Sequence, residues 1–188
     1  MKTQLQNEVN MITDTAVRTL VQNVLDAAPA CFWTMPAATT GKYHPAYALG
    51  DGGLIRHTKA VVRLTAHLLN MEGIDAAMPD YSLAIAAAIL HDSCKKNDHE
   101  TYTAFDHPLR AAELIQTTAD LSAMGGHTMP PPAAVRTLCA AVACHMGRWN
   151  SNNRTGQTLP VPLTHLQRLV HTADYLASRK DLSFDGIS

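Results

Sequence analysis

The sequence has no hydrophobic run long enough to cross a membrane. Its longest uninterrupted apolar stretch is Leu83–Leu90, eight residues, whereas a helix needs about 18 to span a bilayer. The first residues, Met1 and Lys2, are followed by polar residues rather than by the apolar core of a signal peptide. We therefore expect a cytoplasmic protein with no membrane partner.

The sequence also lacks paired cysteines. None of its four cysteines belongs to a CxxC motif, and in a cytoplasmic protein such isolated cysteines predict free thiols rather than disulfides.

An excess of charge of one sign is absent as well, because 15 basic residues face 16 acidic ones. This balance gives no overall basic character of the kind that indicates nucleic-acid or membrane binding. The charges are nevertheless unevenly distributed: residues 70–120 carry nine acids and three bases, and residues 130–180 carry six bases and one acid. Such blocks are typical of solvated faces, and they can also steer an anion to one side of a fold.

What the sequence does contain is helical periodicity, over a length of 188 residues that suits one domain. The predicted helices span about 13–28, 54–71, 80–95, 107–120, 133–146 and 163–178, with a further short helix before the first. Asp80 and Asp106 are the expected N-caps of the third and fourth. The AIAAAIL segment is apolar on every face, which is typical of a central, buried helix. We predict an all-α fold in which residues 29–53 form an irregular segment too long to be a simple connector.

Ten histidines are the unusual feature of the composition. The helical stripes direct six ionisable groups inward from five helices: His57, His91, Asp92, His107, His145 and Asp174. A single histidine of this kind is more often a hydrogen-bonded core residue than a ligand. Six buried together need a compensating partner, because burying unpaired charges costs several kcal/mol. A divalent cation is that partner, and the mixed nitrogen and oxygen donors suit manganese, iron, zinc, cobalt or nickel.

The spacing of these residues resembles a known family. The motifs are GGLIRHT at 52–58, ILHDSCK at 89–95, His107-Pro108, His145 with Gly147, and Ala173-Asp174-Tyr175. Over about residues 41–180 they resemble the HD-domain metal-dependent phosphohydrolase superfamily. The resemblance implies a helical bundle, with residues 41–188 as the HD-type domain and 1–40 as a helical extension and loop packed on it.

The resemblance also implies a ligand set. The first metal would be held by His57, His91, Asp92 and Asp174, and a second by His107 and His145 with Asp92 bridging. Two features depart from the family pattern: Cys94 stands where glycine is usual, and binuclear members often carry paired histidines where this chain has His145-Met146. We therefore expect one or two divalent transition metals in each chain.

A metal-activated water predicts hydrolysis of a phosphoester. Asp92 is the expected catalytic carboxylate, which binds metal and orients the water. Lys95 lies one turn beyond His91 and is expected to stabilise charge on the phosphoryl oxygens, although a solvated helix end beside Lys96 is the alternative.

Substrate contacts are expected from two segments. Lys42 and His44 lie in the irregular segment before the first ligand helix, where a purely structural role is about equally consistent with the sequence. Arg148 and Trp149 follow the His145 helix, and an Arg-Trp pair beside a metal can bind phosphate and stack a base. A plain surface loop is the alternative for that pair.

The near-neutral charge favours a small phosphorylated substrate, a nucleotide, over a polymer. The basic 130–180 segment keeps open an HD-type phosphodiesterase or exonuclease that acts on single-stranded RNA or DNA. A non-catalytic, metal-stabilised regulatory module is a third reading. The sequence does not indicate the oligomeric state and leaves a homo-oligomer open.

Overall fold

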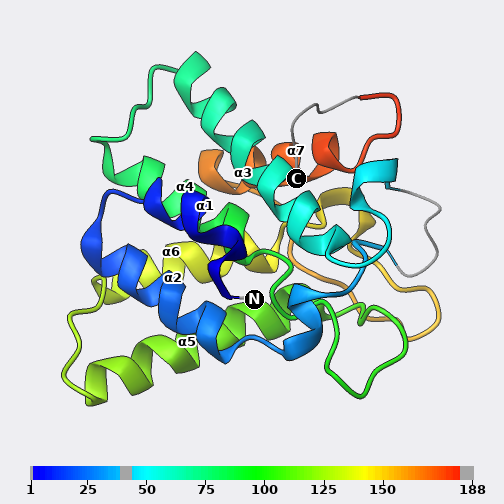
Figure 1. Ribbon diagram of the computed structural model, residues 1–188, viewed down its shortest axis with the longest axis horizontal. Helices are drawn as coiled ribbons and strands as arrows, with labels where there is room; N and C mark the ends of the chain where they lie inside the picture. The colour runs from blue at the N-terminus through cyan, green and yellow to red at the C-terminus, as the bar shows by residue number, and fades with distance from the viewer. Residues whose placement is uncertain (1, 39–43, 183–188) are drawn as a thin grey trace.

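The protein is a bundle of α-helices (Figure 1). The computed structural model describes residues 2–38 and 44–182, and within these ranges there are seven α-helices and four short 3₁₀ helices. The α-helices are α1 (Gln6–Asn10), α2 (Thr15–Ala27), α3 (Gly53–Met71), α4 (Pro79–Leu90), α5 (His107–Met124), α6 (Pro132–Ala143) and α7 (His165–Ala177). The described residues form no strand, only an isolated bridge between Ser151 and Thr158. The predicted all-α fold is confirmed.

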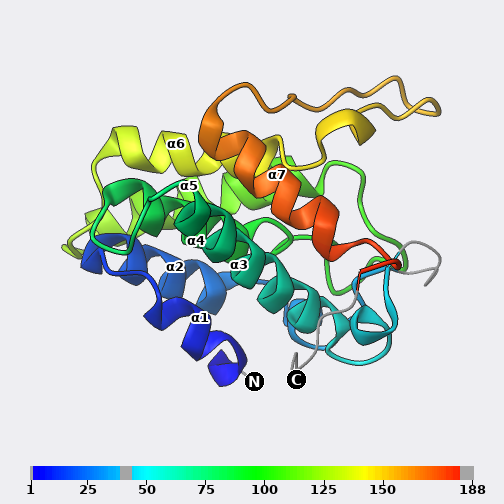
Figure 2. The same cartoon turned by 90° about the horizontal axis from the view of Figure 1, so that it is seen from above.

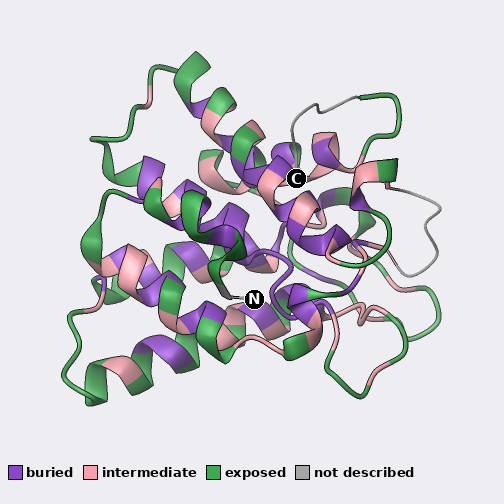
Figure 3. Ribbon diagram, viewed as in Figure 1, coloured by how far each residue is buried: buried purple, intermediate pink, exposed green. Residues whose placement is uncertain are grey.

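Helix α4 occupies the centre of the bundle. It contacts α1, α2, α3, α6 and α7, and every residue from Ala84 to Leu90 is buried. Figure 3 shows the buried residues gathered along the faces that the helices turn toward one another. A helix surrounded on all sides needs apolar residues on all sides, which is why AIAAAIL has no polar face.

The ends of α4 differ from the prediction. Met78 is the N-cap and Pro79 opens the helix, so the prediction that Asp80 caps it is wrong. Proline suits the first helical position because it lacks the N–H that would have no partner there. The helix also ends at Leu90 rather than near Lys95, since residues 91–94 form a turn and a bend follows.

Other helix ends differ from the prediction by up to four residues: α5 ends at Met124 rather than near Asp120. Asp106 is the N-cap residue of α5, but its side chain accepts no capping hydrogen bond and instead pairs with Arg110 at 2.9 Å. Helix α6 ends at Ala143, so His145 lies in the turn after the helix rather than within it. Thr164 and Gln167 form a reciprocal capping box that begins α7.

The irregular segment packs against the start of α3. Gly52 N donates to Thr34 O, and Leu54 N donates to Met35 O, at 2.7 and 2.9 Å. A Cβ atom at Gly53 would lie 2.2 Å from the carbonyl oxygen of Ala48, so only glycine allows this approach. Arg56 then donates to the carbonyl oxygens of three residues of the segment: Tyr47, Leu49 and Asp51.

The remaining expectations about the chain concern cysteines and membranes. Cys31, Cys94, Cys139 and Cys144 are all free thiols, as predicted. In the described ranges, no helix is both long enough and apolar enough to span a bilayer.

Candidate metal centre

Four histidines and two aspartates converge from five parts of the bundle. His57 lies in α3, His91 and Asp92 follow α4, and His107 opens α5. His145 follows α6, and Asp174 lies in α7. All but Asp174 are at least 97% buried, and the Asp174 side chain is 20% exposed. We call these six residues the His–Asp cluster.

Asp92 lies in the middle of the His–Asp cluster. Its Oδ1 atom is 3.0 Å from His107 Nε2 and 3.6 Å from His145 Nε2. Its Oδ2 atom is 3.4 Å from His91 Nε2 and 4.0 Å from His57 Nε2. The two oxygens of one carboxylate therefore face two pairs of imidazoles.

Asp174 completes one side of the His–Asp cluster. Its Oδ1 atom lies 3.0 Å from His57 Nε2 and 3.7 Å from His91 Nε2. The expected first group of ligands is thus brought together by α3, α7 and the end of α4, which pack directly against one another.

Backbone carbonyls set the tautomers of three of these histidines. The Nδ1 atoms of His91, His107 and His145 lie 2.7–2.8 Å from the carbonyl oxygens three residues earlier in each case. A carbonyl oxygen only accepts, so each Nδ1 carries the proton and donates it. In the neutral imidazole this leaves the Nε2 lone pair free toward the centre of the cluster, the arrangement typical of metal ligands.

Burial and neighbouring charges act in opposite directions on the pKa values of the His–Asp cluster. Burial lowers the pKa values of His57 and His107, so both are neutral at pH 7. Burial alone would raise the pKa of Asp92, but Lys95 and His91 lower it far below its usual range. Burial also opposes ionisation of Asp174, yet His57 and His91 hold its pKa low. Two ionised carboxylates therefore share a buried space with the neutral imidazoles of His57 and His107, whereas Asp92 and Asp174 raise the pKa of His91.

Unpaired polar atoms show that the residues fit a divalent metal. Within the described part of the chain, His91 Nε2 and Asp92 Oδ1 are buried and have no hydrogen-bond partner. His107 Nε2 and His145 Nε2 lie only 3.2 Å apart, which places two lone pairs face to face. Divalent cations would supply the partners that these donor atoms lack.

The donor atoms divide into two candidate groups that share Asp92. One comprises His57, His91 and Asp92, and the other comprises Asp92, His107 and His145. The atoms of each group lie within 4.8 Å of one another.

Lys95 is buried in this region rather than solvated. Its side chain is about 10% exposed, and its ammonium group donates to Asp92 Oδ2. The turn that ends α4 makes this contact, because it brings Lys95 back over Asp92.

The residues expected to contact substrate are distributed differently. Lys42 lies outside the described residues. The His44 ring packs edge-on against the ring of His57 at 5.1 Å, and burial lowers the pKa of His44 to about 3. Arg148 and Trp149 are exposed on the short 3₁₀ helix η4 (Gly147–Trp149), so they do not belong to the buried cluster.

His171 and Tyr175 are neighbours of the cluster to which sequence reasoning assigned no role. His171 Nδ1 donates to His145 O at 2.7 Å, and Tyr175 stacks on Trp149. Their spacing of four residues on α7 could have indicated a shared face. Their contacts with His145 and Trp149, in a separate segment of the chain, were not predictable from this spacing.

Comparison with known proteins supplies the family. The sequence model of the HD domain matches residues 54–179, more than half of the chain. This chain belongs to the HD-domain family. The match begins at α3 and ends just beyond α7, so it contains all six residues of the His–Asp cluster. No curated protein and no solved structure matched.

An HD domain implies the metal-dependent phosphohydrolase superfamily, and the His–Asp cluster offers donor atoms that could hold metal.

Proposed function

We propose that this HD-domain protein hydrolyses a phosphoester bond of a small, nucleotide-type substrate. The observation that supports this proposal is the pair of donor groups sharing Asp92, with their unpaired Nε2 and carboxylate atoms. Neutral imidazoles and ionised carboxylates form a ligand set for a divalent transition metal.

The proposed ligand assignment follows the two groups. His57, His91, Asp92 and Asp174 hold the first metal, and His107 and His145 hold a second with Asp92 shared between them. Such metal ions supply a water activated at neutral pH and positive charge against the phosphate oxygens.

The remaining chemistry belongs to side chains of this chain. Asp92 is proposed as the carboxylate that orients the attacking water, since its two oxygens reach both ligand groups. Lys95 is proposed to place its ammonium group beside the phosphoryl oxygens while it holds Asp92 in position. The backbone carbonyls behind His91, His107 and His145 keep the three Nε2 atoms aimed inward.

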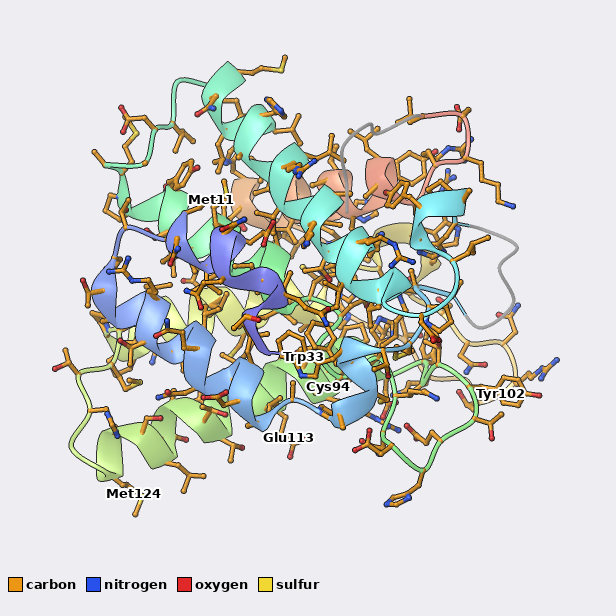
Figure 4. The ribbon with its side chains drawn as sticks, in the orientation of Figure 1. Met11, Trp33, Cys94, Tyr102, Glu113 and Met124 are labelled. Carbon is orange, nitrogen blue, oxygen red and sulfur yellow. The ribbon has the colours of Figure 1, made fainter. Side chains whose placement is uncertain are left out.

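Metal analysis combined with a phosphate-release assay tests the proposal. We expect one to two equivalents of divalent metal per chain and release of phosphate from nucleoside monophosphates. Asp92→Asn keeps the size of the side chain but removes the charge, so it should abolish turnover. Tyr102→Ala, an exposed change (Figure 4), should leave turnover intact and serves as the control.

Two results would contradict the proposal. A protein that binds no manganese, iron, cobalt, nickel or zinc after reconstitution cannot use the His–Asp cluster as assigned. A metal-loaded protein that hydrolyses no phosphoester would instead be a regulatory module stabilised by metal.

A second candidate, a phosphodiesterase or exonuclease for single strands, is favoured by exposed basic residues after α6. Three arginines that follow α6 in the sequence are exposed: Arg148, Arg154 and Arg168. A salt titration separates the two candidates, because binding that neutralises several phosphates weakens steeply with salt. A small nucleotide should show weak salt dependence, whereas an oligonucleotide substrate should lose a hundredfold or more in affinity over a roughly fourfold increase in salt.

A further inference from the structure

An exposed aromatic stack lies beside the His–Asp cluster. The indole of Trp149 stacks on the ring of Tyr175, with centroids 5.4 Å apart and planes 23° from parallel. The guanidinium carbon of Arg148 lies 4.5 Å from the centre of the Trp149 ring, and that of Arg179 lies 5.5 Å from the centre of the Tyr175 ring. We call these four residues the Trp149 platform.

The Trp149 platform is tied to the cluster by both of its elements. Tyr175 directly follows Asp174 on α7, and the other element, η4, begins two residues after His145. His171 fastens the two together, because its Nδ1 atom donates to His145 O and its ring packs against Gly147. Figure 2 shows the segment between α6 and α7 running alongside α7. The platform therefore lies next in sequence to two cluster residues, His145 and Asp174, and the Asp174 side chain is 20% exposed.

The chemistry of the Trp149 platform suits a planar ring that carries a phosphate. Trp149 is 45% exposed, so part of its ring is accessible to a ligand. Exposed cation–π contacts are weaker than the stacking of a base on an aromatic side chain. A base can therefore displace the exposed Arg148 guanidinium from the indole, and the freed guanidinium can then bind phosphate.

We propose that the Trp149 platform binds the base of the substrate, with Trp149 as the specificity-determining residue. This inference rests on the proposed function, because it places the phosphate of the same nucleotide at the His–Asp cluster. A bare phosphoester would use the cluster alone, so the platform distinguishes nucleotides from other phosphoesters. The base can belong to a free nucleotide or to the end of a strand.

Fluorescence titration tests this without relying on turnover. Trp33 is 4% exposed, so quenching by adenosine 5′-monophosphate reports Trp149. We expect Trp149→Ala to weaken binding of this nucleotide roughly 5- to 100-fold, measured by calorimetry. Trp149→Phe should retain most of the affinity, and binding of ribose 5-phosphate, which has no base, should not change in either variant.

Matched controls and a second probe complete the design. Tyr102→Ala removes another exposed aromatic ring, and Arg136→Ala removes an exposed arginine of α6; both should leave nucleotide affinity unchanged. A short oligodeoxyadenylate is titrated in parallel. Binding of the oligonucleotide alone, lost in Trp149→Ala, also supports the stacked base and assigns it to a strand end.

The inference and the proposed function fail in different ways. Equal nucleotide affinity of the wild type and Trp149→Ala, with metal content unchanged, would overturn the platform and leave hydrolysis untouched. Nucleotide binding that depends on Trp149 in a metal-loaded protein without any phosphatase activity would overturn the function and keep the platform. An equal loss of ribose 5-phosphate binding in Trp149→Ala would mean that the platform holds phosphate rather than a base.

Discussion

At the scale of single residues, the two donor groups differ in how their imidazoles are held. The Nε2 atoms of His107 and His145 lie 3.2 Å apart, and each ring donates from Nδ1 to the backbone carbonyl oxygen three residues earlier. His57 has no partner at Nδ1 in the described ranges, and its Nε2 atom lies 3.0 Å from Asp174 Oδ1. The histidines of the second group, like His91 of the first, are therefore oriented by the backbone, and His57 is oriented by the side chain of Asp174.

The division of the donor atoms into two groups leads to a prediction about metal stoichiometry. His107→Ala or His145→Ala should lower the metal content by about one equivalent, because each removes a donor from the second group only. The first group keeps all of its donors and should stay occupied. Elemental analysis of the purified variants measures this. Loss of both metals together, or of neither, would show that the proposed division of ligands is wrong.

At the scale of elements, the position of His145 depends on the contact between the turn after α6 and α7. Gly147 has a φ of +56°, and a Cβ atom there would lie 2.2 Å from the ring of His171. The His171 ring cannot easily move away, because it donates to His145 O. The glycine thus allows α7 to approach the turn that carries His145, a proposed ligand.

Replacing this glycine should be costly. Gly147→Ala combines backbone strain with a clash, and we expect it to lower the free energy of unfolding by roughly 2–5 kcal/mol. Gly126→Ala is the matched control: its φ is +81° and no atom lies within 4 Å, so only strain of about 1–2 kcal/mol applies. Denaturant unfolding measures both. Adding His171→Ala to Gly147→Ala should recover part of the loss, and no recovery would contradict the proposed contact.

At the scale of the whole molecule, the His–Asp cluster joins helices that are distant in sequence. The N-terminal helix α2 packs on α4 and α5, and its Leu20, Val21 and Val24 side chains are fully buried in the same hydrophobic core. These contacts support the proposal that residues 1–40 are an extension of one domain formed by 41–188. Because the six proposed ligands come from five parts of that domain, we expect its stability to depend on the cluster.

The stability of the protein should therefore depend on metal and on pH together. A ligand at about 100 times its dissociation constant stabilises by roughly 2.7 kcal/mol, and each kcal/mol shifts Tm by about 2–4 °C in a domain of this size. Chelation at pH 7.5 should lower Tm by roughly 5–10 °C. Melting curves with and without chelator measure the difference, and no change in protein that has lost its metal would contradict the assignment.

The sign of the pH effect follows from the histidines. Burial lowers the pKa values of His57 and His107, so the unfolded chain, with pKa values near 6.5, binds more protons. Stability should fall as the pH drops below about 6.5, and the metal effect should shrink in the same range because protonated imidazoles do not bind metal. His91 acts oppositely in metal-free protein, since Asp92 and Asp174 overcome the effect of burial and raise its pKa.

Periodicity by itself determined the all-α fold and the central place of α4, because the apolar face of a helix is a local property of its sequence. The spacing of the motifs by itself indicated the family. The same patterns predicted that the six cluster residues face inward, and the roles of those residues stay predictions. Helix ends were less predictable. Helix α4 begins at Pro79, so Asp80 lies inside the helix instead of capping it. The helix also ends at Leu90, and the turn that follows brings the Lys95 ammonium group to Asp92. Only the tertiary structure decided which atoms meet, such as His107 with His145 or Trp149 with Tyr175. Those pairs come from separate elements, and their distances depend on helix packing that no local pattern encodes.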